Sequence, residues 1–148
     1  MTVETKNGLK VQVDEKQKIT FPQGLFGFEN MTDFVLLDCE YKPFFWMQSL
    51  QEKNLSFLIV DPFLFFSDYE IDADDSILKT IDLTKPEDVK IMCIVTVPND
   101  GSGVTINMQG PLVINKINNK AMQIILPDER YTTKHNLLEQ IKNGGSAC

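Results

Sequence analysis

The residues that could perform catalysis are few and widely spaced in this 148-residue sequence. The one histidine is His135, and the three cysteines, Cys39, Cys93 and Cys148, include no CxxC pair. Catalysis requires a group that exchanges protons near neutral pH, a metal or an activated nucleophile, and no motif assembles one here. We interpret His135 as a solvent-facing or helix-capping residue, and Cys93 as a small buried hydrophobe within a strand. The sequence therefore predicts a protein that is not an enzyme and uses no cofactor.

Carboxylates are abundant, and their distribution is uneven. Residues 61–88 hold nine acidic residues and two lysines, whereas the rest of the chain holds twelve acidic and twelve basic residues, so the entire net charge of −7 lies in this segment. A calcium-binding loop beginning at Asp72 would place Ile77 and Leu83 where glycine and glutamate are required. A loop beginning at Asp68 fails in the same way. We therefore expect no metal site.

An acidic surface repels nucleic-acid phosphates and anionic lipids, and it attracts basic proteins. We therefore expect the acidic segment, residues 61–88, to contact a basic protein and not to bind nucleic acid or membrane directly. The candidate contact residues are Asp68, Glu70, Asp72, Asp74 and Asp75. The alternative is a solvated face that only keeps the protein soluble.

Aromatic residues are the second candidate binding feature. They are concentrated at 44–46 and 57–69, and a small β domain cannot bury both faces of its sheet completely. Some of these side chains are expected at an exposed groove or edge, and the rest in the core. The candidates are Phe44, Trp46, Phe63 and Phe66.

The elements that must position these residues are mostly strands. Alternating or β-branched runs predict strands at 9–13, 18–21, 33–38, 44–50, 56–60, 89–97, 104–109, 112–115 and 121–126. Helical spacing of apolar residues predicts short helices at 74–81 and 133–143. The segment PQGLFGFEN at 22–30 predicts a structured loop, because its glycines and proline interrupt an aromatic run.

Short strands with little helix between them favour a mainly β fold, a small antiparallel β-barrel-like or sandwich domain with one or two short helices. We expect a single domain over residues 1–142 and a flexible tail at 143–148. The N-terminus shows no signal-peptide pattern, and the odd number of cysteines fits a reducing compartment. Both features predict a cytoplasmic protein.

Several segments together resemble the FliW family of flagellar assembly factors. They are ITFPQGLFGFEN at 19–30, PFFWMQSL at 43–50, FLIVDPFLFFSDYEID at 57–72, KPEDV before IVTVP at 85–98, TINMQGPLVIN at 105–115 and QIIL at 123–126. Their order and spacing match the family over roughly residues 3 to 140, and Gly110 departs from the alanine that is more usual before this proline. The resemblance covers nearly the whole chain.

The resemblance implies two protein partners. One is flagellin, held in the cytoplasm before its export, and the other is CsrA, a small basic dimer that binds messenger RNA and represses flagellin translation. Export of flagellin would free the FliW-like protein to engage CsrA beside its RNA site and so lift the repression. On this reading the acidic residues face CsrA, and the aromatic candidates face flagellin.

Two other functions remain open at this point. The first is a generic acidic adaptor for another basic, nucleic-acid-binding protein, which would bind no flagellin. The second is a small hydrolase or metal protein, whose activity His135→Ala would abolish.

Overall fold

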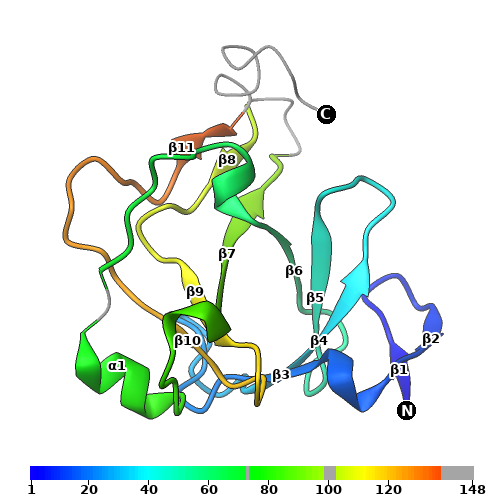
Figure 1. The fold of residues 1–148 in the computed structure, drawn as a ribbon. Helices are drawn as coiled ribbons and strands as arrows, with labels where there is room; N and C mark the ends of the chain where they lie inside the picture. Colours follow the sequence, from blue (N-terminus) through cyan, green and yellow to red (C-terminus); the bar gives the residue numbers. More distant parts are fainter. Residues whose placement is uncertain (73, 99–102, 138–148) are drawn as a thin grey trace.

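The computed structural model describes residues 1–72, 74–98 and 103–137, and it is built almost entirely from short antiparallel strands (Figure 1). The strands are β1 (Thr2–Glu4), β2 (Lys10–Gln12), β3 (Lys18–Thr20), β4 (Asp33–Asp38), β5 (Phe45–Ser49), β6 (Ser56–Val60), β7 (Val89–Thr96), β8 (Thr105–Ile106), β9 (Leu112–Asn115), β10 (Ala121–Gln123) and β11 (His135–Asn136). The helical elements are α1 (Asp75–Thr80) and the single 3-10 turns η1 (Glu15–Gln17), η2 (Pro62–Leu64) and η3 (Pro86–Asp88). None of the helices in these ranges is long and apolar enough to cross a membrane.

Nine strands form one sheet, in which seven follow the order β10-β9-β7-β6-β5-β4-β3 and β8 and β11 extend it from β7. The two ends of this sheet meet, because Thr20 in β3 forms a bridge with Lys120 beside β10. The backbone N–H of Thr20 donates to the carbonyl of Asn119 at 3.0 Å. The bridge closes the sheet into a small barrel, and the predicted mainly β, barrel-like fold is confirmed.

Strand β7 is the longest strand and contacts three others. Its first half, Val89 to Met92, pairs with β9, and its last two residues pair with β8. On its other edge β6 pairs only with the second half, from Cys93 to Val95. Pro62 follows β6 almost at once, in η2, and the chain turns away before β6 can cover the rest of β7.

Alternate residues of each strand point into the barrel, and these inward residues are mainly apolar. Phe34 and Met47, on the neighbouring strands β4 and β5, are fully buried there. The rings of Phe21 and Phe34 meet edge to face, with centroids 5.6 Å apart. The buried members of this cluster are Ile19, Phe21, Leu25, Phe34, Met47, Ile59, Met92, Leu112, Ile114 and Ala121.

Two segments cover the outside of the barrel. The β1–β2 hairpin packs Val3 and Val13 against Val35 on the outer face of β4. On the other side of the molecule, residues 61–83 and 104–137 enclose a larger outer cluster over β6 and β7 (Figure 1). The buried members of the outer cluster are Val60, Phe66, Tyr69, Ile81, Ile91, Cys93, Val95, Ile106, Met108, Val113, Ile124, Leu126, Tyr131 and Leu137.

Most predicted elements are present, with three corrections. The strands at 33–38, 56–60 and 112–115 have the predicted bounds, and the helix at 74–81 is α1 with its cap. Strand β1 was not predicted, and the strands at 104–109 and 121–126 are shorter than predicted. The helix predicted at 133–143 does not begin at residue 133, because His135 and Asn136 form a strand paired with β8. Leu137 is helical, and the rest of the predicted helix lies outside the described residues. Residues 138–148, including the expected tail and Cys148, lie outside the described residues.

Candidate protein-binding site

The acidic segment is fixed to the barrel by the side chains of its inward face. The Asp61 carboxylate accepts a hydrogen bond from the backbone N–H of Phe63 at 2.9 Å and caps η2. Beyond this turn Phe66 and Tyr69 enter the outer cluster, where they are 8% and 5% exposed. The Tyr69 hydroxyl donates to the carbonyl of Met108 at 2.6 Å. The segment therefore has a defined path across the sheet.

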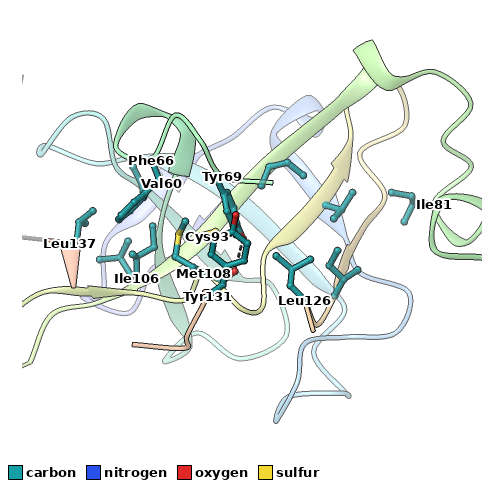
Figure 2. Packing of buried hydrophobic residues seen from close by; sticks show 14 residues of the cluster. Val60, Phe66, Tyr69, Ile81, Cys93, Ile106, Met108, Leu126, Tyr131 and Leu137 are labelled. Carbon is teal, nitrogen blue, oxygen red and sulfur yellow. Dashed lines mark hydrogen bonds between the residues drawn. The ribbon is translucent and has the colours of Figure 1, made fainter. Parts of the chain in front are cut away.

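Two tyrosines fasten the middle of the acidic segment. The rings of Tyr69 and Tyr131 meet edge to face with centroids 4.8 Å apart, and the Tyr131 hydroxyl accepts from the backbone N–H of Glu70 at 2.9 Å. Figure 2 shows Tyr69 between Cys93, Met108 and Tyr131 in the outer cluster. Burial raises the pKa of the Tyr69 hydroxyl far above its ordinary range, so this group stays protonated and can donate.

Helix α1 begins at an acidic cap. The Asp74 carboxylate accepts from the Ser76 hydroxyl at 2.6 Å and from the Ile77 N–H at 3.1 Å. These two hydrogen bonds, the one from Ser76 first, lower the pKa of Asp74. At the other end of the helix, Ile81 is fully buried, and its carbonyl accepts from the side-chain amide of Asn115 at 2.9 Å. Both ends of α1 are thus held in place.

The carboxylates of the acidic segment point mostly to solvent. All five candidates, Asp68, Glu70, Asp72, Asp74 and Asp75, are exposed. Within the described residues, two carboxylates of the segment form ion pairs with basic residues from outside it: Asp82 with Lys120 at 2.8 Å, and Glu70 with Arg130 at 3.5 Å. Arg130 also pairs with Asp128, so its charge is shared. Most of the negative charge of the segment is therefore displayed on the surface.

The four aromatic candidates lie in different environments. Trp46 and Phe63 are 39% and 42% exposed, and Phe63 also contacts Tyr69 with ring centroids 5.7 Å apart. Phe44 is half-buried and stacks on Phe65 at 6.3 Å. Phe66 lies in the outer cluster, where the ring of His135 meets it edge to face at 5.0 Å. Within the acidic segment, the structure thus brings Phe63 to the surface and places Phe66 in the interior.

A groove of about 810 Å³ runs between the acidic segment and the first half of β7. Two of the candidate residues, Phe63 and Asp72, line it together. The other lining residues are Asp61, Ile71, Leu78, Leu83, Thr84, Lys85, Pro86, Val89, Lys90, Ile91, Val113 and Lys116. Its walls are mainly apolar with charged residues among them, which is the usual composition of a site that binds a peptide segment or small molecule.

The residues considered for catalysis are separate in space or buried. His135 lies in β11 with its ring against Phe66, so the expected position at a helix start is wrong. Cys93 is fully buried, and burial raises the pKa of its thiol to about 12, which disfavours the thiolate needed for nucleophilic attack. Cys39 is also buried. Across 1–72, 74–98 and 103–137, no three His, Cys, Asp or Glu side chains are grouped to hold a metal ion.

Sequence reasoning missed two surface features. The loop 22–30 displays Phe26 and Phe28, which are 54% and 41% exposed. Gly24 adopts φ +69°, and a Cβ there would collide with the Glu29 backbone, so a glycine is required to shape this loop. The second feature is the set of lysines at the groove: Lys85 before η3, Lys90 on β7 and Lys116 in the turn after β9. A strand run at 89–97 that is longer than its partner at 56–60 was the available signal for the groove.

The model of the FliW protein family matches residues 2–137. The flagellar assembly factor FliW of Treponema denticola is 44% identical over 98% of this chain and 99% of its own length. The protein of the same name from Bacillus velezensis is 38% identical over the full length of both chains.

A solved structure shares the fold as well as the sequence pattern. The crystal structure of the flagellar assembly factor FliW superposes with a TM-score of 0.84 at 37% sequence identity, covering 93% of this chain and 96% of that chain. The family match spans the barrel, the acidic segment and β11. The chain therefore belongs to the FliW family of flagellar assembly factors.

Proposed function

We propose that this protein is a cytoplasmic flagellar assembly factor that binds flagellin and, when flagellin is exported, binds CsrA. It acts by holding its partners, without turnover of a substrate. CsrA bound in this way would stop repressing flagellin translation, so synthesis of the filament subunit would follow its export. Membership of the FliW family supports the role in flagellar assembly. The two partners, flagellin and CsrA, are proposed from the resemblance to that family.

The observation that carries the CsrA part is the exposed acidic segment. An RNA-binding protein presents lysines and arginines, and seven of the nine carboxylates of residues 61–88 are exposed to meet them. Complementary charge of this kind raises association rates from about 10⁵–10⁶ to as much as 10⁸–10⁹ M⁻¹s⁻¹ at low salt. An acidic body bound beside the RNA site would also repel incoming phosphates. Both effects match the antagonism proposed here.

Flagellin would use apolar contacts. Capture of a helical or extended segment requires exposed apolar side chains, and Phe44, Trp46 and Phe63 are the accessible candidates. Phe66 is buried, so its effect on flagellin binding would come through the packing of the outer cluster. Phe63→Ala is therefore the direct test of this contact, and Tyr41→Phe, at a 71% exposed site, is a matched control. Weaker flagellin binding by the first variant alone is the expected result.

A competition titration tests the partner exchange. Fluorescently labelled CsrA is bound to this protein, and purified flagellin monomer is added while anisotropy and size-exclusion profiles are recorded. We expect flagellin to release CsrA, with no complex that contains all three proteins. A stable ternary complex, or no binding of either partner, would contradict the proposed exchange.

The exposed charge also fits a second function, that of an acidic adaptor for a different basic protein. A pull-down from a lysate of a flagellated bacterium separates the two functions. Flagellin should dominate the bound fraction for the proposed function, and it should be absent for the adaptor.

A further inference from the structure

One edge of β7 lacks a neighbouring strand over its first half. Strand β6 pairs with β7 from Cys93 to Val95 and ends at Val60, whereas β7 itself begins at Val89. The 3-10 turn after β6 carries the chain away from the sheet. The backbone of Val89 to Met92 is therefore paired with β9 on one side only, within the part of the chain that the structure describes.

The direction of the backbone groups follows from two hydrogen bonds. The carbonyls of Asp88 and Ile94 accept from the N–H groups of Lys116 and Asn107, both on the β8–β9 side, at 2.8 Å each. Because N–H and C=O groups alternate sides along a strand, those of Val89 and Ile91 face the opposite side, toward the groove. The Val89 N–H is already bonded to Pro86. Three backbone groups therefore face the groove without a strand partner among the described residues: the carbonyl of Val89, and the N–H and the carbonyl of Ile91.

The walls of the groove would suit the side chains of an added strand. Phe63, Leu78 and Leu83 provide apolar surface opposite this edge. Two carboxylates, those of Asp61 and Asp72, line the groove together with three exposed lysines, Lys85, Lys90 and Lys116. None of these three forms an ion pair with a carboxylate of residues 1–72, 74–98 or 103–137 within 4 Å. The three lysines outnumber the two carboxylates, and the Asp61 carboxylate already caps η2. The groove therefore favours a ligand that carries both apolar and acidic groups.

We propose that this groove binds an extended acidic segment of a partner protein, which pairs with the free edge of β7 as an additional strand. Main-chain hydrogen bonds to Ile91 and Val89 supply part of the affinity, and alternate side chains enter the apolar groove. Acidic side chains on the other face of the segment meet the three lysines. The groove shares Phe63 and Asp72 with the candidate residues for flagellin and CsrA. Its three lysines suit an acidic ligand, whereas the outward carboxylates of residues 61–88 suit a basic partner, and binding in the groove does not depend on the proposed exchange between flagellin and CsrA.

A short synthetic strand tests the site directly. The probe is a fluorescein-labelled peptide of the sequence SVEVEVS, and its matched control is SVKVKVS. We expect the acidic peptide to bind at least tenfold more tightly than the basic one, and the triple variant Lys85→Glu, Lys90→Glu, Lys116→Glu to lose this preference. The control variant Lys6→Glu, Lys10→Glu, Lys42→Glu changes the net charge equally at exposed sites away from the groove and should keep it. Tighter binding of the basic peptide would overturn the proposal.

The strand pairing has its own readout. Two peptides, each N-methylated at one of two adjacent residues, differ only in whether the methyl group faces the β7 edge or points away from it. One of the two should bind about tenfold more weakly, and hydrogen exchange of the Ile91 amide should slow in the presence of the unmethylated peptide. Equal binding of both methylated peptides, or self-association of the protein through this groove in sedimentation analysis, would overturn the proposal. CsrA affinity of the lysine triple variant, measured in parallel, reports on the proposed function separately.

Discussion

The barrel is covered by two segments that differ in what they bury and what they display. The β1–β2 hairpin buries Val3 and Val13 over the outer face of β4, in a cluster of three buried residues. The acidic segment, residues 61–88, helps to enclose a cluster of fourteen buried residues, and seven of its nine carboxylates are exposed on its outward side. The hairpin only covers the outer face of β4, whereas the acidic segment covers part of the sheet and also displays carboxylates and lines a groove.

The difference shows how a charged binding surface can be made rigid in a small protein. Repulsion between neighbouring carboxylates would favour an extended, mobile segment. Buried apolar contacts and hydrogen bonds on its inward side, such as those of Tyr69 and Ile81, oppose this repulsion. The comparison predicts that substitutions on the inward side change stability, and that those on the outward side change binding.

The largest expected effect on stability is that of Ile81→Ala. Ile81 is fully buried at the end of α1, and removing three methyl and methylene groups leaves a cavity beneath the acidic segment. We expect a loss of about 2–5 kcal/mol in the free energy of unfolding, measured by urea denaturation. Ile117→Ala is the matched control, because Ile117 is 75% exposed and should change stability little. Equal effects of the two variants would show that the segment is not anchored at α1.

Tyr69→Phe should have the next largest effect. The substitution keeps the ring contact with Tyr131 and removes the hydrogen bond to the Met108 carbonyl in the outer cluster. We expect a loss of roughly 1–3 kcal/mol, since a buried acceptor is left without this donor. Thermal unfolding measures the change, and Tyr41→Phe at an exposed site should leave the midpoint where it is. An unchanged unfolding midpoint for Tyr69→Phe would show that the Tyr69 hydroxyl does not anchor the acidic segment.

The hairpin should be less sensitive. Val3→Ala removes two methyl groups from the small cluster beneath β1. We expect a loss of roughly 1–2 kcal/mol in the free energy of unfolding. CsrA and flagellin binding should not change. A loss larger than that of Ile81→Ala, or weaker partner binding, would reverse the comparison between the two covers.

The smallest expected effect is that of Asp82→Asn. The ion pair between Asp82 and Lys120 joins the acidic segment to the turn before β10, but both side chains are largely exposed. Exposed pairs of this kind contribute about 0–1 kcal/mol, and they contribute less at high salt. Asparagine also tolerates the positive φ of 56° at this position. A loss above this range in urea denaturation would mean that ion pairs, and not apolar contacts, hold the segment.

The sequence predicted the fold where local pattern and tertiary structure agree. Short continuous apolar runs at 33–38 and 56–60 marked β4 and β6 correctly, and the aspartates before Ile77 marked the start of α1. Helical spacing of Leu137 and its neighbours predicted a helix from residue 133, but His135 and Asn136 pair with Ile106 and Thr105 as a strand, and the described helical part is Leu137 alone. Pairing between distant segments has no local signal, so this error could not be avoided from the sequence.

The candidate site was predictable in part for a similar reason. The excess of acidic residues at 61–88 can be counted in the sequence, and charged side chains usually lie at the surface, so the exposure of these carboxylates was predictable. Which aromatic residues reach the surface depends on the packing of the outer cluster, so Phe63 and Phe66 could not be separated. The groove is made by the difference in length between β6 and β7 together with lysines from three separate positions. The lengths of the two runs were visible in the sequence, but their pairing and the meeting of the lysines were not.

The central claim is that the outward carboxylates of the acidic segment bind a basic partner, and one measurement tests it most directly. The variant Asp72→Asn, Asp74→Asn, Asp75→Asn removes three charges and keeps a helix cap, because asparagine caps as well as aspartate. The control variant Glu15→Gln, Glu40→Gln, Glu52→Gln removes three exposed charges elsewhere. CsrA affinity is measured for both variants and the original protein across a salt series. We expect roughly tenfold weaker binding at low salt and a flatter salt dependence for the aspartate variant alone. Unchanged affinity of that variant at every salt concentration would contradict the account.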